Sequence, residues 1–153
     1  MYEYHVDGTQ PTKKNVLFVF GSNKKGKHGG GAAKAALDHF GAVWGNGFGY
    51  QGSSYAIPTK EDYSTTMPIW EIQEYITEFV EYTNKYAEYA AGIMAIDPME
   101  EPDQLFVTRI GCGLAGLKDE DIAPMFKGAK LCSFPEEWKE YLEADNPVPT
   151  EEE

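Results

Sequence analysis

The sequence predicts an α/β fold in a single domain, with a mixed, mostly parallel sheet flanked by helices. Short apolar runs typical of buried strands alternate with segments whose apolar residues recur at about the 3.6-residue period of an α-helix. Two of these runs, residues 15–20 and 104–109, lead into glycine-rich loops that precede helical segments. Strands that alternate with helices build parallel or mixed sheets, and 153 residues suit one domain with its own core.

The first part of the chain is expected to open on a loose N-terminal arm, residues 1–14, with a short edge strand at residues 2–6. A buried strand at residues 15–20 then leads through the first glycine loop into a helix at about residues 31–40. Residues 42–44 are a candidate short strand.

A glycine-rich, turn-like stretch follows at residues 45–52 and is predicted to be a surface loop. The next strand, residues 54–58, is expected to end at Pro58, because proline lacks the N–H that a sheet uses. The longest predicted helix covers residues 68–90, where apolar or small residues follow the helical period. Pro68 at its start suits a helix N-terminus. Its aromatic residues are interpreted as packing and not as a base-stacking platform.

The second half repeats the alternation of strands and helices. Residues 93–96 are a possible strand or helix end, followed by a loop at 97–103, a strand at 104–109, a helix at 119–126, a short strand at 130–134 and a helix at 135–142. Residues 146–153 form an acidic tail that is predicted to be disordered, so the domain is predicted to span residues 15–145.

The formal net charge is −12, which argues against broad binding of nucleic acid or of anionic membranes. Six of the 13 basic residues nevertheless lie before position 35, and a local cationic patch fits a small anionic ligand. No stretch approaches the roughly 20 apolar residues of a membrane span. No signal peptide is expected, and two cysteines do not make a disulfide framework. The predicted location is therefore the cytoplasm.

The two glycine loops predict a cleft that binds a phosphate-containing ligand. Loops at the carboxyl ends of strands bind ligands in open α/β sheets, and glycine lets backbone N–H groups approach a phosphate closely. The first loop also contains Gly21-x-x-x-x-Gly26-Lys27, the start of a P-loop, which is an alternative. Residues 93–97 are the candidate magnesium-binding strand of that alternative. Against it, His28 occupies the position of the hydroxyl residue that would hold the metal.

Three segments, in this order, resemble the macro domain superfamily, whose members bind ADP-ribose. They are GGGAAKA at residues 29–35, YAIPTK at residues 55–60 and IGCGLAG at residues 110–116. The resemblance covers about residues 15–134 and implies a single macro-like domain. It extends to small macro-like proteins of bacteriophages and bacteria, which implies the host cytoplasm if the chain is phage-encoded.

The resemblance implies that N–H groups of both loops hold a diphosphate and that Asn23 helps to orient the distal ribose. The expected ligand contacts are Gly21, Ser22, Asn23, His28, Gly29, Gly30, Gly31, Ala32, Pro58, Thr59, Ile110, Gly111, Cys112, Gly113, Leu114, Ala115 and Gly116. The N–H groups near Cys112 would favour its thiolate form, but the preferred interpretation is that Cys112 is a small residue in a tight loop. Arg109 is not assigned to the cleft, and no metal ion or cofactor is expected.

The second loop is most similar to the subgroup that removes ADP-ribose from glutamate side chains or from DNA bases. This implies Lys60 as a catalytic residue whose amine would attack the anomeric carbon of the distal ribose. That subgroup carries an acid directly after GCGL, where this chain has Ala115; Glu61 and Asp62 are candidate replacements. Two partners therefore remain possible: ADP-ribosylated protein or DNA as a substrate, or an NAD-derived signalling nucleotide captured without catalysis.

Overall fold

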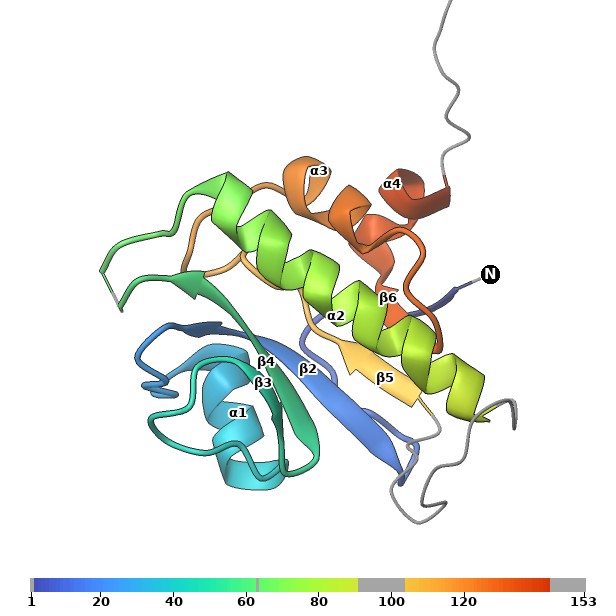
Figure 1. Cartoon of the computed structure of the whole chain (residues 1–153), viewed down its shortest axis with the longest axis horizontal. Helices are drawn as coiled ribbons and strands as arrows, with labels where there is room; N and C mark the ends of the chain where they lie inside the picture. Colours follow the sequence, from blue (N-terminus) through green and yellow to red (C-terminus); the bar gives the residue numbers. More distant parts are fainter. Residues whose placement is uncertain (1, 63, 91–103, 144–153) are drawn as a thin grey trace, which may run out of the picture.

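Six strands pair into one sheet in the order β1-β6-β5-β2-β4-β3 in the computed structural model (Figure 1). The structure describes residues 2–62, 64–90 and 104–143. All neighbouring strands are parallel except β3 and β4, which confirms the predicted α/β fold with a mostly parallel sheet. The strands are β1 (Glu3–His5), β2 (Val16–Asn23), β3 (Gly49–Gln51), β4 (Ser54–Lys60), β5 (Gln104–Val107) and β6 (Cys132–Pro135).

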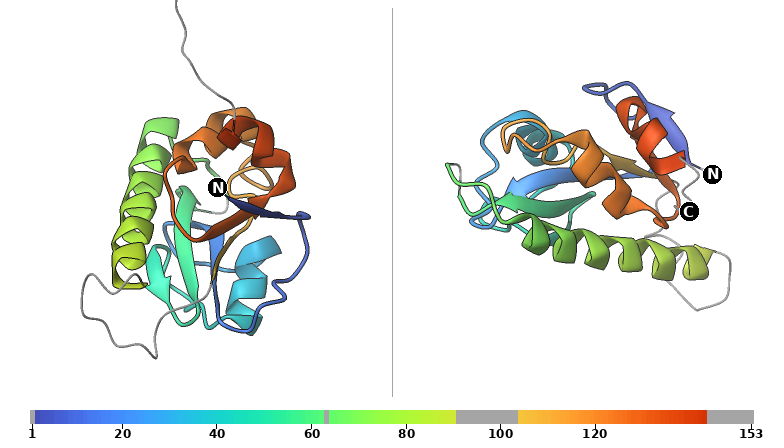
Figure 2. Two further views of the ribbon diagram at one scale, coloured as in Figure 1. Left: turned by 90° about the vertical axis from the view of Figure 1, so that its right-hand side faces the viewer. Right: turned by 90° about the horizontal axis from the view of Figure 1, so that it is seen from above.

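Helices cover both faces of the sheet (Figure 2). On one face lie α2 (Ile69–Ala90) and the C-terminal segment with α3 (Asp119–Ile122) and α4 (Lys139–Glu143). That segment also holds the 3-10 helices η2 (Ala123–Phe126) and η3 (Glu136–Trp138), and the other face carries α1 (Gly31–His39). None of the described helices is long and apolar enough to cross a membrane.

Alternating side chains of β2 separate the two cores. Leu17 and Val19 belong to the larger core beneath α2, whereas Phe18 and Phe20 belong to the smaller core beneath α1. The buried residues of α1 are Ala33 and Ala36, whose small side chains let the helix approach these rings closely. The close approach brings the N-terminus of α1 near the carboxyl end of β2.

The predicted edge strand in the N-terminal arm is confirmed as β1, which pairs in parallel with β6. The His5 ring stacks on Phe106 with ring centroids 3.8 Å apart, and its Nδ1 lies 2.8 Å from the Ser133 hydroxyl. The chain then turns at Val6, because the Thr9 N–H donates to the Val6 carbonyl and Gly8 has a φ of +85°. The start of the chain is thus docked on the sheet.

Several predicted boundaries are wrong. Residues 42–44 form no strand, and the predicted surface loop 45–52 contains β3, which pairs with β4. The strand predicted to stop at Pro58 continues to Lys60. Proline is tolerated there because β3 begins at Gly49, opposite Ala56, so that the part of β4 after Ala56 pairs with β2 and not with β3.

Two predicted helices are each divided into shorter elements. The helix expected at 119–126 consists of α3 and η2, with Pro124 in η2, and the one expected at 135–142 consists of η3 and α4. The predictions for residues 93–96, 97–103 and 146–153 lie outside the described residues.

Candidate functional site

A cleft of about 1040 Å³ lies at the carboxyl edge of the sheet, where the loops after β2, β4 and β5 meet. The two glycine loops begin close together. A Cβ placed on Gly21, at the start of the first loop, would lie 3.5 Å from Cγ2 of Ile110, at the start of the second. Besides Lys60, the cleft is lined by most of the predicted ligand contacts, namely Gly21, Ser22, Asn23, Gly29, Gly30, Gly31, Ala32, Thr59, Ile110, Gly111, Cys112, Gly113, Leu114 and Ala115. The segments that the sequence analysis singled out therefore share one site.

The first loop is braced by polar side chains at the end of β2. The Asn23 amide donates to the Lys27 carbonyl at 3.1 Å and accepts from the Lys27 N–H at 3.0 Å. The Ser22 hydroxyl donates to the carbonyl of Gly47. Both side chains are thus engaged in holding the loop. The amide of Asn23, which was expected to orient the distal ribose, uses both its oxygen and its nitrogen for this purpose.

The N-terminus of α1 opens into the cleft without a cap. Gly30 is the N-cap and offers no side chain, and the first turn contains no acid. The first helical bond runs from the Lys34 N–H to the Gly30 carbonyl at 3.2 Å. The N–H groups of Gly31, Ala32 and Ala33 precede that bond and have no acceptor within the helix. All three residues line the cleft, where these donors and the helix dipole favour an anion.

The second loop turns on two glycines with left-handed backbone, Gly111 at φ +81° and Gly116 at φ +74°. The Leu117 N–H donates to the Gly111 carbonyl at 2.8 Å and closes the loop. Within the described part of the chain, the N–H groups of residues 113–115 donate no hydrogen bond. These donors face the same cleft as the α1 N-terminus, which makes a concave site for an anion.

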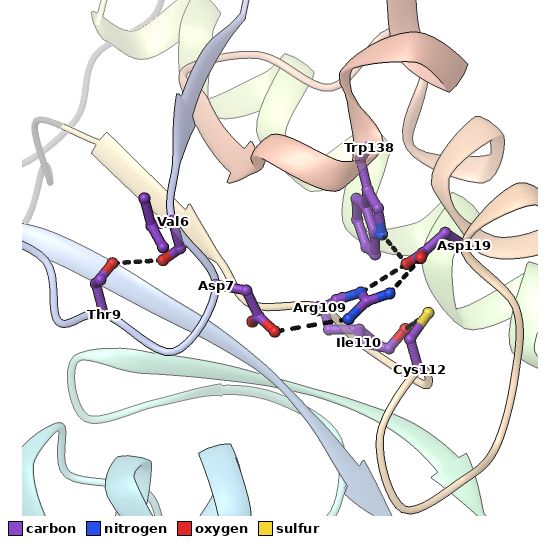
Figure 3. Close-up of polar contacts among 8 residues, drawn as sticks. All are labelled: Val6, Asp7, Thr9, Arg109, Ile110, Cys112, Asp119 and Trp138. Carbon is purple, nitrogen blue, oxygen red and sulfur yellow. Dashed lines mark hydrogen bonds and ion pairs between the residues drawn. The ribbon is translucent and has the colours of Figure 1, made fainter.

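Arg109 lines the cleft, although the sequence analysis did not assign it there. Its Nε donates to Asp119 Oδ1 at 2.8 Å and its Nη2 donates to Oδ2 at 2.5 Å (Figure 3). The indole N–H of Trp138 donates to the same carboxylate at 2.8 Å. The remaining Nη1 lies 3.8 Å from a carboxylate oxygen of Asp7 in the turn after β1. The guanidinium of Arg109 is therefore held by Asp119 and Asp7 while the residue lines the cleft.

Of the two interpretations of Cys112, the structure supports a small residue in a tight loop and not a thiolate. The thiol is half-buried, and its S–H donates to the Ile110 carbonyl at 3.6 Å. Burial and the nearby Asp119 carboxylate raise the pKa of Cys112 to about 12. The thiol therefore stays protonated near neutral pH and serves as a small residue in a tight loop.

Arg109 and Trp138 lower the pKa of Asp119 to about 2 from its ordinary 3.8. Because the folded pKa lies below the unfolded one, the stabilisation is complete above about pH 4 and is lost as the pH falls toward 2. We expect this group to account for about 1–2 kcal/mol of the loss of unfolding free energy over that range. Urea unfolding at pH 4, 3 and 2 should show a flatter profile for Asp119→Asn. The exposed neighbour Glu120→Gln serves as the control, and the same flattening in both variants would contradict the assignment.

Three expected ligand contacts do not line the described cleft: His28, Pro58 and Gly116. His28 is completely buried, with its Nε2 3.0 Å from the Asn46 carbonyl and its ring edge-on to Phe20. Its side chain therefore supports the loop from below. Pro58 is a buried strand residue of β4.

Lys60 lies at the end of β4 and lines the cleft, but the two candidate acids beside it are engaged elsewhere. Glu61 lies 3.0 Å from the Lys24 ammonium, which also contacts Glu71 at 2.6 Å. Asp62 accepts hydrogen bonds from the N–H and the hydroxyl of Ser64, which lower its pKa. Neither acid lines the cleft.

Sequence reasoning missed both flanks of the cleft. The lining residues that were missed on the flank near β1 and β5 are, besides Arg109, His5, Asp7, Gly8, Thr9, Gln10, Phe18, Phe106 and Thr108. On the other side, the residue that was missed is the exposed Trp44. The Asp7-Gly8 pair is a turn signal, but it does not say that the turn lies over this cleft.

Comparisons with protein-family models, with curated proteins and with solved structures found no match. Among the described residues, no three His, Cys, Asp or Glu side chains are grouped so that they could hold a metal ion. The functional argument therefore rests on the geometry of the cleft.

Proposed function

We propose that the cleft binds ADP-ribose or a related ADP-ribosyl nucleotide. The observation that carries the proposal is that the uncapped N-terminus of α1 and the N–H groups of residues 113–115 line the same cleft. A diphosphate spreads its charge over several oxygens, so it is matched by donors that come from two loops. Lys27 and Arg109 add positive charge to the lining.

The flank of the cleft nearest β1 suits a purine base. Phe18, Phe106 and Ala35 contribute apolar surface to the lining there. Asp7 supplies a carboxylate at the rim, which would accept a hydrogen bond from a base amino group but would repel a phosphate. The cleft volume of about 1040 Å³ is slightly above the roughly 300–1,000 Å³ that small-molecule sites span, which suits a large ligand such as a nucleotide.

The P-loop alternative has less support. In that motif the helix begins directly after the glycine-lysine pair, so that the lysine and the loop hold the phosphates together. Here α1 begins at Gly31, well after Lys27, and His28 is buried beneath the loop. Residues 93–97, the candidate magnesium-binding strand, lie outside the described residues.

Removal of ADP-ribose from a protein or from DNA is the second candidate, favoured by the position of Lys60 in the cleft. Its amine would form a bond to the anomeric carbon while the bond from that carbon to the leaving group breaks. Of the described cleft residues, Asp7 is the carboxylate, and it lies on the opposite flank from Lys60. Because the carboxylate among the described lining residues belongs to the other flank, the arrangement favours binding without turnover, as in capture of an NAD-derived nucleotide.

The free thiols Cys112 and Cys132 are consistent with a cytoplasmic location.

Calorimetric titration with ADP-ribose, ATP and GTP tests the binding proposal. We expect one ADP-ribose per chain, with binding of ATP and GTP weaker by about tenfold or more, which is about 1.4 kcal/mol. Incubation with ADP-ribosylated protein and DNA then separates the two candidates, with Lys60→Ala as the variant. Release by the wild type that Lys60→Ala abolishes would establish an eraser, and we expect no release. Magnesium-dependent ATP binding without any response to ADP-ribose would overturn the proposal.

A further inference from the structure

Trp44 lines the cleft with 57 % of its surface exposed. Indole is the largest apolar side chain, and its burial would be favourable, so an exposed tryptophan in a concave site needs a physical reason. Among the described residues, no aromatic ring stacks on it. The reason cannot be a loose loop, because the segment that carries Trp44 is tightly built.

Backbone and side-chain hydrogen bonds hold both sides of Trp44. The Val43 N–H donates to the Gln51 side-chain oxygen at 2.8 Å, and Gln51 is buried. The Gly45 N–H donates to the Gly26 carbonyl of the first glycine loop at 2.8 Å. The residues directly before and after Trp44 are thus anchored to different elements.

The next two residues are packed against the same loop. The Asn46 carbonyl accepts hydrogen bonds from His28 Nε2 at 3.0 Å and from Gln51 Nε2 at 3.1 Å. The backbone of Gly47 approaches Asn23 so closely that a Cβ on Gly47 would lie 2.2 Å from the Asn23 carbonyl oxygen. Residues 43–47 therefore form a fixed platform, and the exposure of Trp44 is built into the fold.

The order of the strands places this platform on the flank opposite the base pocket. His5 and Phe106 come from β1 and β5, whereas residues 43–47 lead into β3, at the other edge of the sheet beyond β4. The phosphate donors of the two glycine loops follow β2 and β5, in the middle of the sheet order. A ligand whose base lies near Phe106 and whose diphosphate lies at the loops thus extends toward Lys60 and Trp44.

We propose that Trp44 stacks on a planar heteroaromatic ring joined to the distal ribose, so that the ligand is a dinucleotide of the NAD type. This inference rests on the proposed function, because it assumes that the diphosphate occupies the two glycine loops. ADP-ribose ends at the distal ribose and carries no second ring for the indole. A fixed aromatic side chain stacks with little loss of conformational entropy, which is why such side chains serve as binding platforms.

The test compares NAD⁺ with ADP-ribose by calorimetry on the wild type, Trp44→Ala and Trp44→Phe. We expect Trp44→Ala to weaken NAD⁺ binding by about 5–100-fold and ADP-ribose binding by about twofold or less. Trp44→Phe should restore part of the NAD⁺ affinity. The matched control is Trp70→Ala, because Trp70 on α2 is 62 % exposed and does not line the cleft. Quenching of intrinsic fluorescence by NAD⁺ should be lost in Trp44→Ala and kept in Trp70→Ala.

Each outcome is decisive for one of the two proposals. Equal losses for both ligands in Trp44→Ala, or no loss for NAD⁺, would overturn the stacking while ADP-ribose binding still supports the proposed function. NAD⁺ binding that depends on Trp44 without any binding of ADP-ribose would support the stacking and would overturn ADP-ribose itself as the ligand of the proposed function. Binding of neither ligand by the wild type would overturn both.

Discussion

We expect Gly47→Ala to lower the free energy of unfolding by about 3 kcal/mol or more. A Cβ at this position would lie 2.2 Å from the Asn23 carbonyl oxygen and 2.9 Å from that of Lys24. Both obstacles are backbone atoms, so no side chain can rotate away to make room. The loop 43–47 would have to separate from the first glycine loop, which also breaks the bond from Ser22 to the Gly47 carbonyl.

Urea unfolding of Gly47→Ala measures this effect, with Gly29→Ala as the matched control. Gly29 lies in the first glycine loop, and a Cβ there would meet nothing within 4 Å. We expect the control to change the unfolding free energy by less than about 1 kcal/mol. The Gly47→Ala variant should also lose affinity for ADP-ribose, because the first glycine loop, which lines the cleft, would lose the support of residues 43–47. A loss of stability as small as that of the control would contradict the close packing of the two loops.

We expect Asp119→Ala to lower the unfolding free energy by about 2–4 kcal/mol at neutral pH. The Trp138 side chain is completely buried, and its indole N–H would lose its acceptor. Arg109 would lose both hydrogen bonds that hold its guanidinium and would retain Asp7 at 3.8 Å as a weaker partner. The cost exceeds that of an ordinary surface ion pair because the loss leaves a buried donor unpaired.

Two further variants separate the parts of this effect. Asp119→Asn keeps an oxygen that accepts from Trp138 but removes the charge that pairs with Arg109, so we expect an intermediate loss. Asp121→Ala removes an exposed acid of the same helix and should change the stability by less than about 0.5 kcal/mol. Equal losses for Asp119→Ala and Asp121→Ala would show that the carboxylate is not a structural centre of the cleft.

Much of the fold could be predicted from local patterns. Residues 15–20 and 68–90 have the periods of a buried strand and an amphipathic helix, and they form β2 and α2. The errors lie where pairing depends on distant residues. β3 was predicted as loop, because its three residues become a strand through their pairing with β4. Pro58 was taken as a strand end, because the sequence does not show that the pairing of β3 with β4 reaches only as far as Ala56.

In the candidate site, too, the features that depend on local sequence were predicted and those that depend on distant residues were not. The glycine loops were placed at one cleft because each follows an apolar strand and each contains residues that allow unusual backbone angles or close approach. His28 was expected at the ligand, yet it supports the loop from beneath, since its burial depends on Asn46 and Phe20. Arg109 was left unassigned, because the alternation along a strand does not fix the direction of a side chain just after its end.

Backbone requirements are local, so the order of strands and helices and the two phosphate-type loops follow from the sequence. Which side chains meet across the cleft depends on how distant elements pack, and only the folded chain brings Asp7 to Arg109. The same packing turns Trp44, an ordinary residue of a glycine-rich stretch, into an exposed platform, because hydrogen bonds to Gln51 and Gly26 hold the residues on either side of it. The local sequence thus determines the two phosphate-type loops, whereas tertiary contacts determine the flanks of the cleft that would select the ligand.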